Sequence, residues 1–262
     1  MKHIGVILFD IDGVIRNVSN SYNLATKKTV FKYCQWEPSS SDIDLMKHEG
    51  IWNNDWDLSL ELIKRKIKEN NLNYKSPSRK ELINTFSDFY FGCEVKKEFR
   101  KWNGFIKNEE ILAEKNLFSF LSKRKIEWGF VSGAERESAR YILEHRLNLK
   151  SPSLIAMHDA PEKPDPKGFL LLAEKLNKKE LGLSSPPIAY VGDTVADVIT
   201  VINARKKVPN QKFISLALAP PHLHMKSKSQ ERLNYESKLK EAGADFILNS
   251  VNDLKTIYLE LF

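Results

Sequence analysis

The chain has 262 residues, of which 42% are hydrophobic and 29% are charged, a composition that excludes a disordered or fibrous protein. Its 41 Lys and Arg residues outnumber 34 Asp and Glu residues, which gives a formal net charge of +7. Basic and acidic residues are mixed through 61–69, 94–101 and 174–180, a pattern typical of solvated helix faces. We therefore expect no nucleic-acid partner.

The cysteines and the longest early apolar run bear on where the protein resides. Cys34 and Cys93 cannot build a disulfide framework and have no Cys or His at metal-ligand spacing, so we expect reduced thiols in a cytoplasmic protein. The apolar run 4–9 ends at Asp10 and Asp12. It is too short to span a membrane and lacks the flanks of a signal peptide. We expect no membrane association.

Short apolar runs rich in β-branched residues predict strands that are buried on both faces. These runs lie at 3–9, 128–131, 154–157, 188–191, 213–218 and 246–248. Helical periods lie between them, the first marked by Ile111, Leu112, Phe118 and Leu121. Alternating strands and helices predict an α/β fold with a parallel sheet, a Rossmann-like three-layer α/β/α core.

Residues 17–105 break this alternation and predict a helical domain inserted into the core. One helix is predicted at 57–69, and another follows the capping box Ser78-x-x-Glu81. The predicted domains are a core of 1–16 and 106–262 and a helical insertion of 17–105. Residues 219–237 form a longer excursion, whose role the sequence leaves open.

Polar groups follow the predicted core strands, at the sheet edge where open α/β folds bind their ligands. In chain order these groups are Asp10 with Asp12, Ser132 with Gly133, Lys163, and Asp193 with Asp197. Carboxylates near one point repel unless a cation lies among them, and oxygen-only ligands indicate Mg²⁺. A lysine, a serine hydroxyl and backbone N–H groups would hold a phosphoryl group there.

Structural explanations exist for several of these groups. Ser132-x-x-Glu135 and the pair Thr194 and Asp197 both fit an N-terminal helix cap. Lys163 lies in a proline-containing loop and could be solvated. Two acids at the end of a buried strand, in contrast, bring no packing benefit.

Taken together and in this order, the groups resemble the four motifs of the haloacid dehalogenase superfamily. The matching segments are Asp10-x-Asp12-Gly-Val, Ser132-Gly, Lys163-Pro and Gly192-Asp193-Thr-x-x-Asp197. The helical insertion after the first motif resembles the cap of the phosphatase and phosphomutase branch. The resemblance covers the whole chain and implies the α/β core of that superfamily.

The resemblance implies a role for each of four catalytic residues. Asp10 would be the nucleophile that forms an aspartyl-phosphate. Asp12 would protonate the leaving oxygen and then activate water as a base. Ser132, with the backbone at Gly133, would hold the phosphoryl oxygens, and Lys163 would neutralise the developing negative charge.

The resemblance also implies a Mg²⁺ cofactor. Asp10, the carbonyl of Asp12, and Asp193 would bind the ion directly. Asp197 would orient Lys163 or a metal-bound water.

Asp12 narrows the reaction within the superfamily. Members that break carbon–halogen or carbon–phosphorus bonds usually lack an acid at this position, because no alkoxide leaving group needs a proton. We therefore expect a Mg²⁺-dependent phosphatase acting on a small soluble phosphomonoester. A sugar-phosphate phosphomutase is the alternative that the motifs leave open. A non-catalytic binding module fits the intact motif set less well.

The segment before the 57–69 helix is the predicted specificity region, because it dips into the active site in related caps. Its substrate-binding candidates are Lys47, Asn54, Asp55 and Trp56. Asn54 and Asp55 could bond substrate hydroxyls or cap a helix. Trp52 and Trp56 could stack on a substrate ring, or one of them could belong to the core.

Overall fold

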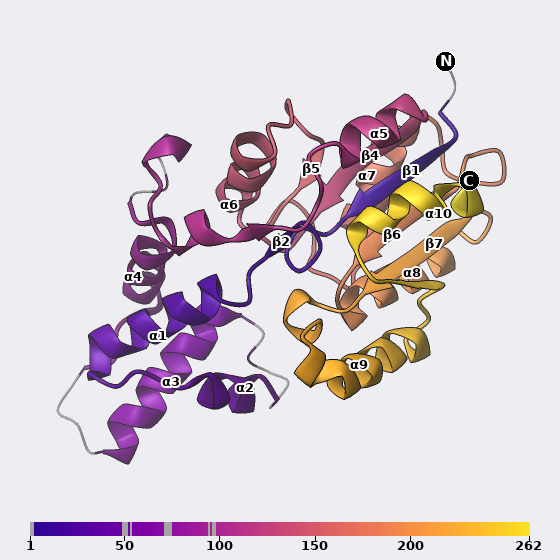
Figure 1. The fold of residues 1–262 in the computed structure, drawn as a ribbon. Helices are drawn as coiled ribbons and strands as arrows, with labels where there is room; N and C mark the ends of the chain where they lie inside the picture. Colours follow the sequence, from indigo (N-terminus) through magenta and orange to yellow (C-terminus); the bar gives the residue numbers. More distant parts are fainter. Residues whose placement is uncertain (1–2, 49–51, 53, 71–74, 94, 96–97) are drawn as a thin grey trace. The chain divides into compact units, whose positions relative to one another are not determined.

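The computed structural model describes residues 3–48, 52, 54–70, 75–93, 95 and 98–262, with the backbone alone at 44, 47 and 48. The chain divides into two compact units. We call residues 1–17 with 110–262 the core unit and residues 18–109 the helical unit (Figure 1).

The core unit is built on a six-stranded sheet with the order β5-β4-β1-β6-β7-β8. Every neighbouring pair in it is parallel. The strands are β1 (Gly5–Phe9), β4 (Ile126–Val131), β5 (Leu154–Ile155), β6 (Ile188–Gly192), β7 (Phe213–Leu218) and β8 (Phe246–Leu248). The predicted parallel α/β fold is confirmed.

Helices cover both faces of this sheet because the strands are apolar on both sides (Figure 1). Val6 and Leu8 of β1 pack with Phe169 and Val201 in one buried cluster. On the opposite face, Phe9 contacts Phe118 edge-on, with ring centroids 5.6 Å apart. The helices are α5 (Leu117–Lys123), α6 (Arg136–Arg140), α7 (Lys167–Asn177), α8 (Val195–Lys207), α9 (Ser229–Glu241) and α10 (Leu254–Leu261).

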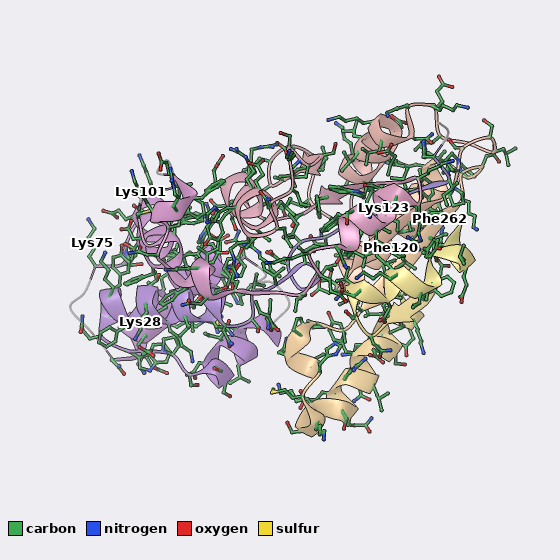
Figure 2. The ribbon with its side chains drawn as sticks, turned by 45° about the horizontal axis from the view of Figure 1, so that its top comes forward. Lys28, Lys75, Lys101, Phe120, Lys123 and Phe262 are labelled. Atoms are coloured by element: carbon green, nitrogen blue, oxygen red, sulfur yellow. The ribbon has the colours of Figure 1, made fainter. Side chains whose placement is uncertain are left out.

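Side chains labelled in Figure 2 show how α10 closes one face. Phe120 of α5 packs edge-on against Tyr258 of α10, with ring centroids 5.5 Å apart. Phe262 lies against Gly5, where a Cβ atom would stand only 2.2 Å from the phenyl ring. A glycine at this position therefore allows the aromatic ring to cover β1.

The helical period predicted to begin at Ile111 is wrong in its first part. Glu110–Ile111 is a short strand, β3, which pairs antiparallel with β2 (Arg16–Asn17). The amide of Leu112 continues the pairing and donates to the Ile15 carbonyl at 2.8 Å. Tertiary pairing thus takes the backbone bonds that a helix would need, and the helix starts only at Leu117.

The helical unit consists of α1 (Ser21–Cys34), α2 (Ser40–His48), α3 (Asp55–Glu69) and α4 (Arg79–Phe91), with short 3₁₀ turns at Phe99–Lys101 and Phe105–Asn108. The predicted capping box is confirmed: Ser78 accepts from the Glu81 amide, and the Glu81 carboxylate accepts from the Ser78 amide at 2.8 Å. Val30, Leu58, Ile63 and other apolar residues form a core of their own.

The positive charge is distributed over both units. Lys75 and Lys101 are exposed on the helical unit, and Lys123 is exposed on the core unit (Figure 2). Among the helices that the structure describes, none combines the length and apolar character needed to cross a membrane.

Candidate active site

Three adjacent strands bring the predicted site residues to one edge of the sheet. Asp10 follows β1, and the strands β4 and β6 lie on either side of it. Ser132 directly follows β4, and Asp193 directly follows β6. The Asp10 amide donates to the Val191 carbonyl at 2.8 Å, which continues the β1–β6 pairing up to the site.

Lys163 lies between two carboxylates at this edge. Its Nζ is 3.0 Å from Asp10 Oδ2 and 2.6 Å from Asp197 Oδ1. The three side chains are 17%, 7% and 2% exposed, so water screens this attraction only weakly. The solvated lysine that the sequence left possible is therefore not observed.

Asp10, Asp193 and Asp197 form a buried acidic cluster, each with one oxygen within 4.8 Å of the others. Burial raises the pKa of Asp10 from 3.8 to about 6, although Lys163 opposes the shift. Burial raises the pKa of Asp193 well above its ordinary value, and repulsion from Asp197 and Asp10 adds to it. With one lysine for three carboxylates, two negative charges stay uncompensated when all are ionised.

The pKa of Lys163 shows that the site favours positive charge. Burial by itself lowers this pKa, but Asp10 and Asp197 outweigh burial and raise the pKa well above its ordinary value. Lys163 is therefore a permanent cation. The remaining negative charge is what a divalent cation would balance.

Asp197 has protein hydrogen-bond donors on both of its carboxylate oxygens. Its Oδ1 accepts from Lys163 and lies 3.2 Å from the Tyr190 hydroxyl, whose single proton is shared between this oxygen and the Val131 carbonyl. Its Oδ2 accepts from the amide and hydroxyl of Thr194, at 3.0 and 2.6 Å, in a capping box at the start of α8. Asp197 therefore serves both the helix cap and the lysine, so the two explanations of the motif hold together.

Asp10 differs from Asp197 because its Oδ1 is buried without a hydrogen-bond partner. A buried carboxylate oxygen without a donor is costly in a protein interior. A bound cation would remove that cost. The residues fit a Mg²⁺ ion, because the candidate ligands at this edge are oxygens and none is Cys or His.

Two glycines let the acidic residues approach the strand ends. Gly13 has a φ of +76°, and a Cβ atom there would stand 1.9 Å from Asp193 Oδ2. A Cβ atom at Gly192 would stand 2.2 Å from the Cβ of Asp197. Any larger residue at either position would displace a carboxylate of the cluster.

Ser132 does not form the helix cap that its spacing allowed. The helix α6 starts at Arg136, and the residue before it, Glu135, makes no side-chain cap. The Ser132 Oγ instead accepts from the Ala134 amide at 3.3 Å and lies near Asp10, where it opposes the rise in pKa that burial causes. Gly133 next to it is exposed, with open space where a Cβ atom would be.

Asp12 has surroundings unlike those of Asp10. Its side chain is 26% exposed, and its Oδ1 accepts from Nε of the fully buried Arg16 at 2.6 Å. The two carboxylates of the first motif are therefore separated by environment: one lies buried against a lysine, the other lies near the surface against an arginine.

Two tyrosines that the sequence did not indicate lie at this site. The Tyr190 hydroxyl donates to the Val131 carbonyl at 2.8 Å and lies 3.4 Å from Lys163 Nζ. A tyrosine inside an apolar strand needs a partner for its hydroxyl, and this signal could have indicated it. Tyr235 of α9 donates to the Asp193 carbonyl at 2.9 Å. No sequence signal links it to Asp193, because 41 residues separate them.

The predicted specificity residues lie in the helical unit. Asn54 caps α3, where its Oδ1 accepts from the Trp56 and Asp57 amides at 3.0 and 3.3 Å. Trp52 and Trp56 both pack partly buried against the helical core, so the core explanation applies to both indoles. Asp55 is half-buried at the start of α3, and the side chain of Lys47 lies outside the described residues.

Comparison with known proteins identifies the family of this chain. A family model described as haloacid dehalogenase-like hydrolase matches residues 4–205. A protein of Phytophthora nicotianae named imidazoleglycerol-phosphate dehydratase is 30% identical over 195 residues, which are 74% of this chain. The chain spans only 40% of that relative's length.

Solved structures share the fold at low sequence identity. A phosphatase from Thermococcus thioreducens is 23% identical, with a TM-score of 0.63, over 80% of this chain and 92% of that one. A putative β-phosphoglucomutase from Thermotoga maritima is 16% identical, with a TM-score of 0.63, over 100% of both chains. A phosphonoacetaldehyde hydrolase-like protein from Oleispira antarctica is 15% identical, with a TM-score of 0.67, over 100% of this chain and 94% of that one.

Proposed function

The chain belongs to the haloacid dehalogenase-like hydrolase family, and on that premise we propose that it is a Mg²⁺-dependent phosphatase for small phosphomonoesters. The observation that carries the proposal is the environment of Asp10. Its Oδ2 faces Lys163 at 3.0 Å, and its Oδ1 is buried without a hydrogen-bond partner. A carboxylate fixed by a cation on one oxygen can present the other to an electrophile.

In the proposed reaction Asp10 is the nucleophile. One of its oxygens attacks phosphorus, the bond between phosphorus and the ester oxygen breaks, and an aspartyl-phosphate forms. Water then attacks this phosphorus, inorganic phosphate leaves, and the Asp10 carboxylate is restored. The buried position of Asp10 limits access of bulk water to the acyl-phosphate.

Asp12 moves the proton in both steps. It gives its proton to the departing ester oxygen and later takes one from the attacking water. The separate environments of Asp10 and Asp12 support this division, because paired carboxylates with different surroundings are suited to different tasks. Asp12 is the more exposed of the two, with 26% of its side chain accessible.

Ser132, the backbone at Gly133, and Lys163 bind the phosphoryl oxygens. Apart from Gly133 and its chain neighbours, no atom of the described residues lies within 4 Å of where a Cβ atom of Gly133 would be, which leaves space for the phosphoryl group. Lys163 carries a permanent positive charge next to Asp10, where negative charge builds up in the transition state.

Mg²⁺ would be held by Asp10, the carbonyl of Asp12, and Asp193, while Asp197 holds Lys163. Asp197 is the least suited to the ion among the three clustered acids, because protein donors already occupy both of its oxygens. When bound, the ion would supply positive charge that offsets the phosphoryl oxygens.

The substrate class is a small phosphorylated metabolite, with Lys47, Asn54, Asp55 and Trp56 proposed as the residues that contact it. Because Asn54 Oδ1 already caps α3, Asn54 would offer its amide N–H groups to substrate oxygens. Trp56 would offer only the part of its indole that the helical core leaves accessible.

The test is phosphate release from sugar phosphates, phosphoglycolate, nucleotides, amino-alcohol phosphates and imidazoleglycerol phosphate, with and without Mg²⁺. We expect turnover that needs Mg²⁺ and is lost in Asp10→Asn. Asp245→Asn is the matched control, since Asp245 pairs with Arg205 next to the amino end of β8, at the other edge of the sheet. Isomerised sugar phosphate without phosphate release would indicate a phosphomutase, and equal release by Asp10→Asn would refute the mechanism.

A further inference from the structure

Arg16 is the one arginine among the buried charged side chains of the described residues. It is 0% exposed, although it stands next to the linker into the helical unit. Guanidinium groups are almost never fully buried unless they are paired. The burial of the Arg16 guanidinium, four residues after Asp12, therefore calls for a charged partner.

The backbone from Ile11 to Arg16 fixes where this guanidinium lies. The Gly13 amide donates to the Arg16 carbonyl at 2.9 Å, and the Arg16 amide donates to the Ile11 carbonyl at 3.0 Å. Arg16 then enters β2 and pairs with Ile111 of β3. Arg16 is thus anchored on both sides, by the turn that carries Asp12 and by the β2–β3 pair.

The side chain of Arg16 contacts the carboxylate of Asp12. Its Nε donates to Asp12 Oδ1 at 2.6 Å, a short charge-assisted hydrogen bond. Burial raises the pKa of Glu135, and His158 and then Arg16 oppose that rise without reversing it. The guanidinium therefore lies within electrostatic reach of Glu135 and donates its Nε–H directly to Asp12.

We infer that Arg16 is a positioning residue that holds the Asp12 carboxylate in the orientation needed for proton transfer to the leaving oxygen. The inference rests on the proposed phosphatase function. A partly exposed aspartate, here with 26% of its side chain accessible, can adopt several side-chain orientations, and proton transfer requires one of them. The anchored guanidinium restricts that choice without touching the substrate.

A positioning role predicts an effect that depends on the leaving group. An alkoxide needs the proton of Asp12 in order to leave, whereas p-nitrophenolate leaves as a stable anion. Arg16→Met should therefore lower kcat/KM for an alkyl phosphate by about 10- to 100-fold. For p-nitrophenyl phosphate we expect a loss of no more than about 3-fold.

The ratio of the two kcat/KM values, measured on one enzyme sample, cancels any loss of folded protein. Arg16→Lys keeps the positive charge but not the Nε–H donor, and should shift the ratio in the same direction by a smaller factor. The matched control is Arg205→Met, which removes an ion pair with Asp245 from the last turn of α8. We expect the control to leave the ratio unchanged.

A second arm tests whether Arg16 acts through Asp12. In an Asp12→Asn background, Arg16→Met should cause no further loss on the alkyl phosphate, because the residue that it positions is already disabled. Equal losses on both esters, an unchanged ratio in both Arg16 variants, or an additive loss in the double variant would overturn the inference alone. A parent enzyme inactive on both esters with Mg²⁺ would overturn the proposed function, and this inference with it.

Discussion

Asp10 and Asp12 stand two residues apart in the segment that directly follows β1, yet their surroundings differ. Asp10 is 5% exposed and lies against Lys163, while Asp12 points to Arg16. A backbone that leaves the strand at this point turns one carboxylate inward and the other outward. The proposed nucleophile and the proposed proton donor are thus separated by the way the chain leaves β1.

Lys163 carries much of the electrostatic stability of the site. Lys163→Met would leave Asp10 and Asp197 buried without their shared cation, which costs about 3–5 kcal/mol of unfolding free energy. Denaturant unfolding in EDTA measures this loss. Adding Asp10→Asn should recover part of it, because one of the stranded charges is then removed, and a double variant no more stable than Lys163→Met would contradict the arrangement.

At the scale of elements, α9 contacts the loop that carries Asp193 through one hydrogen bond. Tyr235 donates to the Asp193 carbonyl at 2.9 Å, and its ring packs beside Val198, Ala217 and Leu239. The 219–237 excursion thus has an observed contact with the acidic cluster, a contact that the sequence left open.

Tyr235→Phe removes this hydroxyl and keeps the ring. We expect Mg²⁺ affinity to fall about 10-fold, because groups that orient metal ligands contribute on this scale. Calorimetric titration of the protein with Mg²⁺ measures the change. Tyr33→Phe is the control, since it also removes a hydroxyl bonded to a backbone carbonyl, that of Glu81 in the helical unit; equal losses in both variants would argue against the contact.

The cap at the start of α4 offers a prediction for the helical unit. Ser78→Ala removes the hydroxyl that accepts from the Glu81 amide, and should cost about 1 kcal/mol of unfolding free energy. Chemical denaturation followed by circular dichroism measures it. Mg²⁺ affinity should stay at the parental value, because the proposed ligands all belong to the core unit.

The sequence predicts the site residues that parallel strand topology brings together, however far apart they lie along the chain. Asp10, Ser132 and Asp193 could be predicted from the sequence because parallel topology brings the carboxyl ends of β1, β4 and β6 to one edge of the sheet. Arg16, Tyr190 and Tyr235 were missed, since their partners are known only once the chain is folded. Contacts that arise only from side-chain packing cannot be recognised from the spacing of residue types along the sequence.

Two local patterns misled for related reasons. Ile111 and Leu112 fit a helical period, but pairing with Ile15 and Arg16 makes them extended. Ser132 and Glu135 have the spacing of a capping box, but α6 starts at Arg136, three residues later than that box requires. In both cases a tertiary contact took the backbone groups that the local pattern had assigned.

For the whole molecule, the acidic cluster makes stability depend on pH and on Mg²⁺. The pKa of Asp10 rises from 3.8 to about 6 on folding, so the folded chain binds more protons than the unfolded chain between these values. Its contribution to the unfolding free energy therefore falls as pH rises through this window. At about 1.4 kcal/mol per pKa unit, the change is up to about 3 kcal/mol.

Comparing the parent with Asp10→Asn isolates this term from other titrating groups. In EDTA, the variant should be less stable than or equal to the parent near pH 4 and more stable near pH 7, by up to about 3 kcal/mol. Mg²⁺ at about 100 times its Kd should add about 2.7 kcal/mol to the parent. Parallel pH profiles of the two proteins in EDTA would contradict a raised pKa at Asp10.

The central claim is that Asp10 is phosphorylated during turnover, and trapping that intermediate tests it most directly. The parent enzyme is mixed with Mg²⁺ and its preferred phosphomonoester, then quenched with borohydride, which reduces an acyl-phosphate to an alcohol. Peptide mass spectrometry should find homoserine at position 10 in the parent and no modification in Asp10→Asn. Reduction at a different carboxylate, or a modified peptide from Asp10→Asn, would contradict the account.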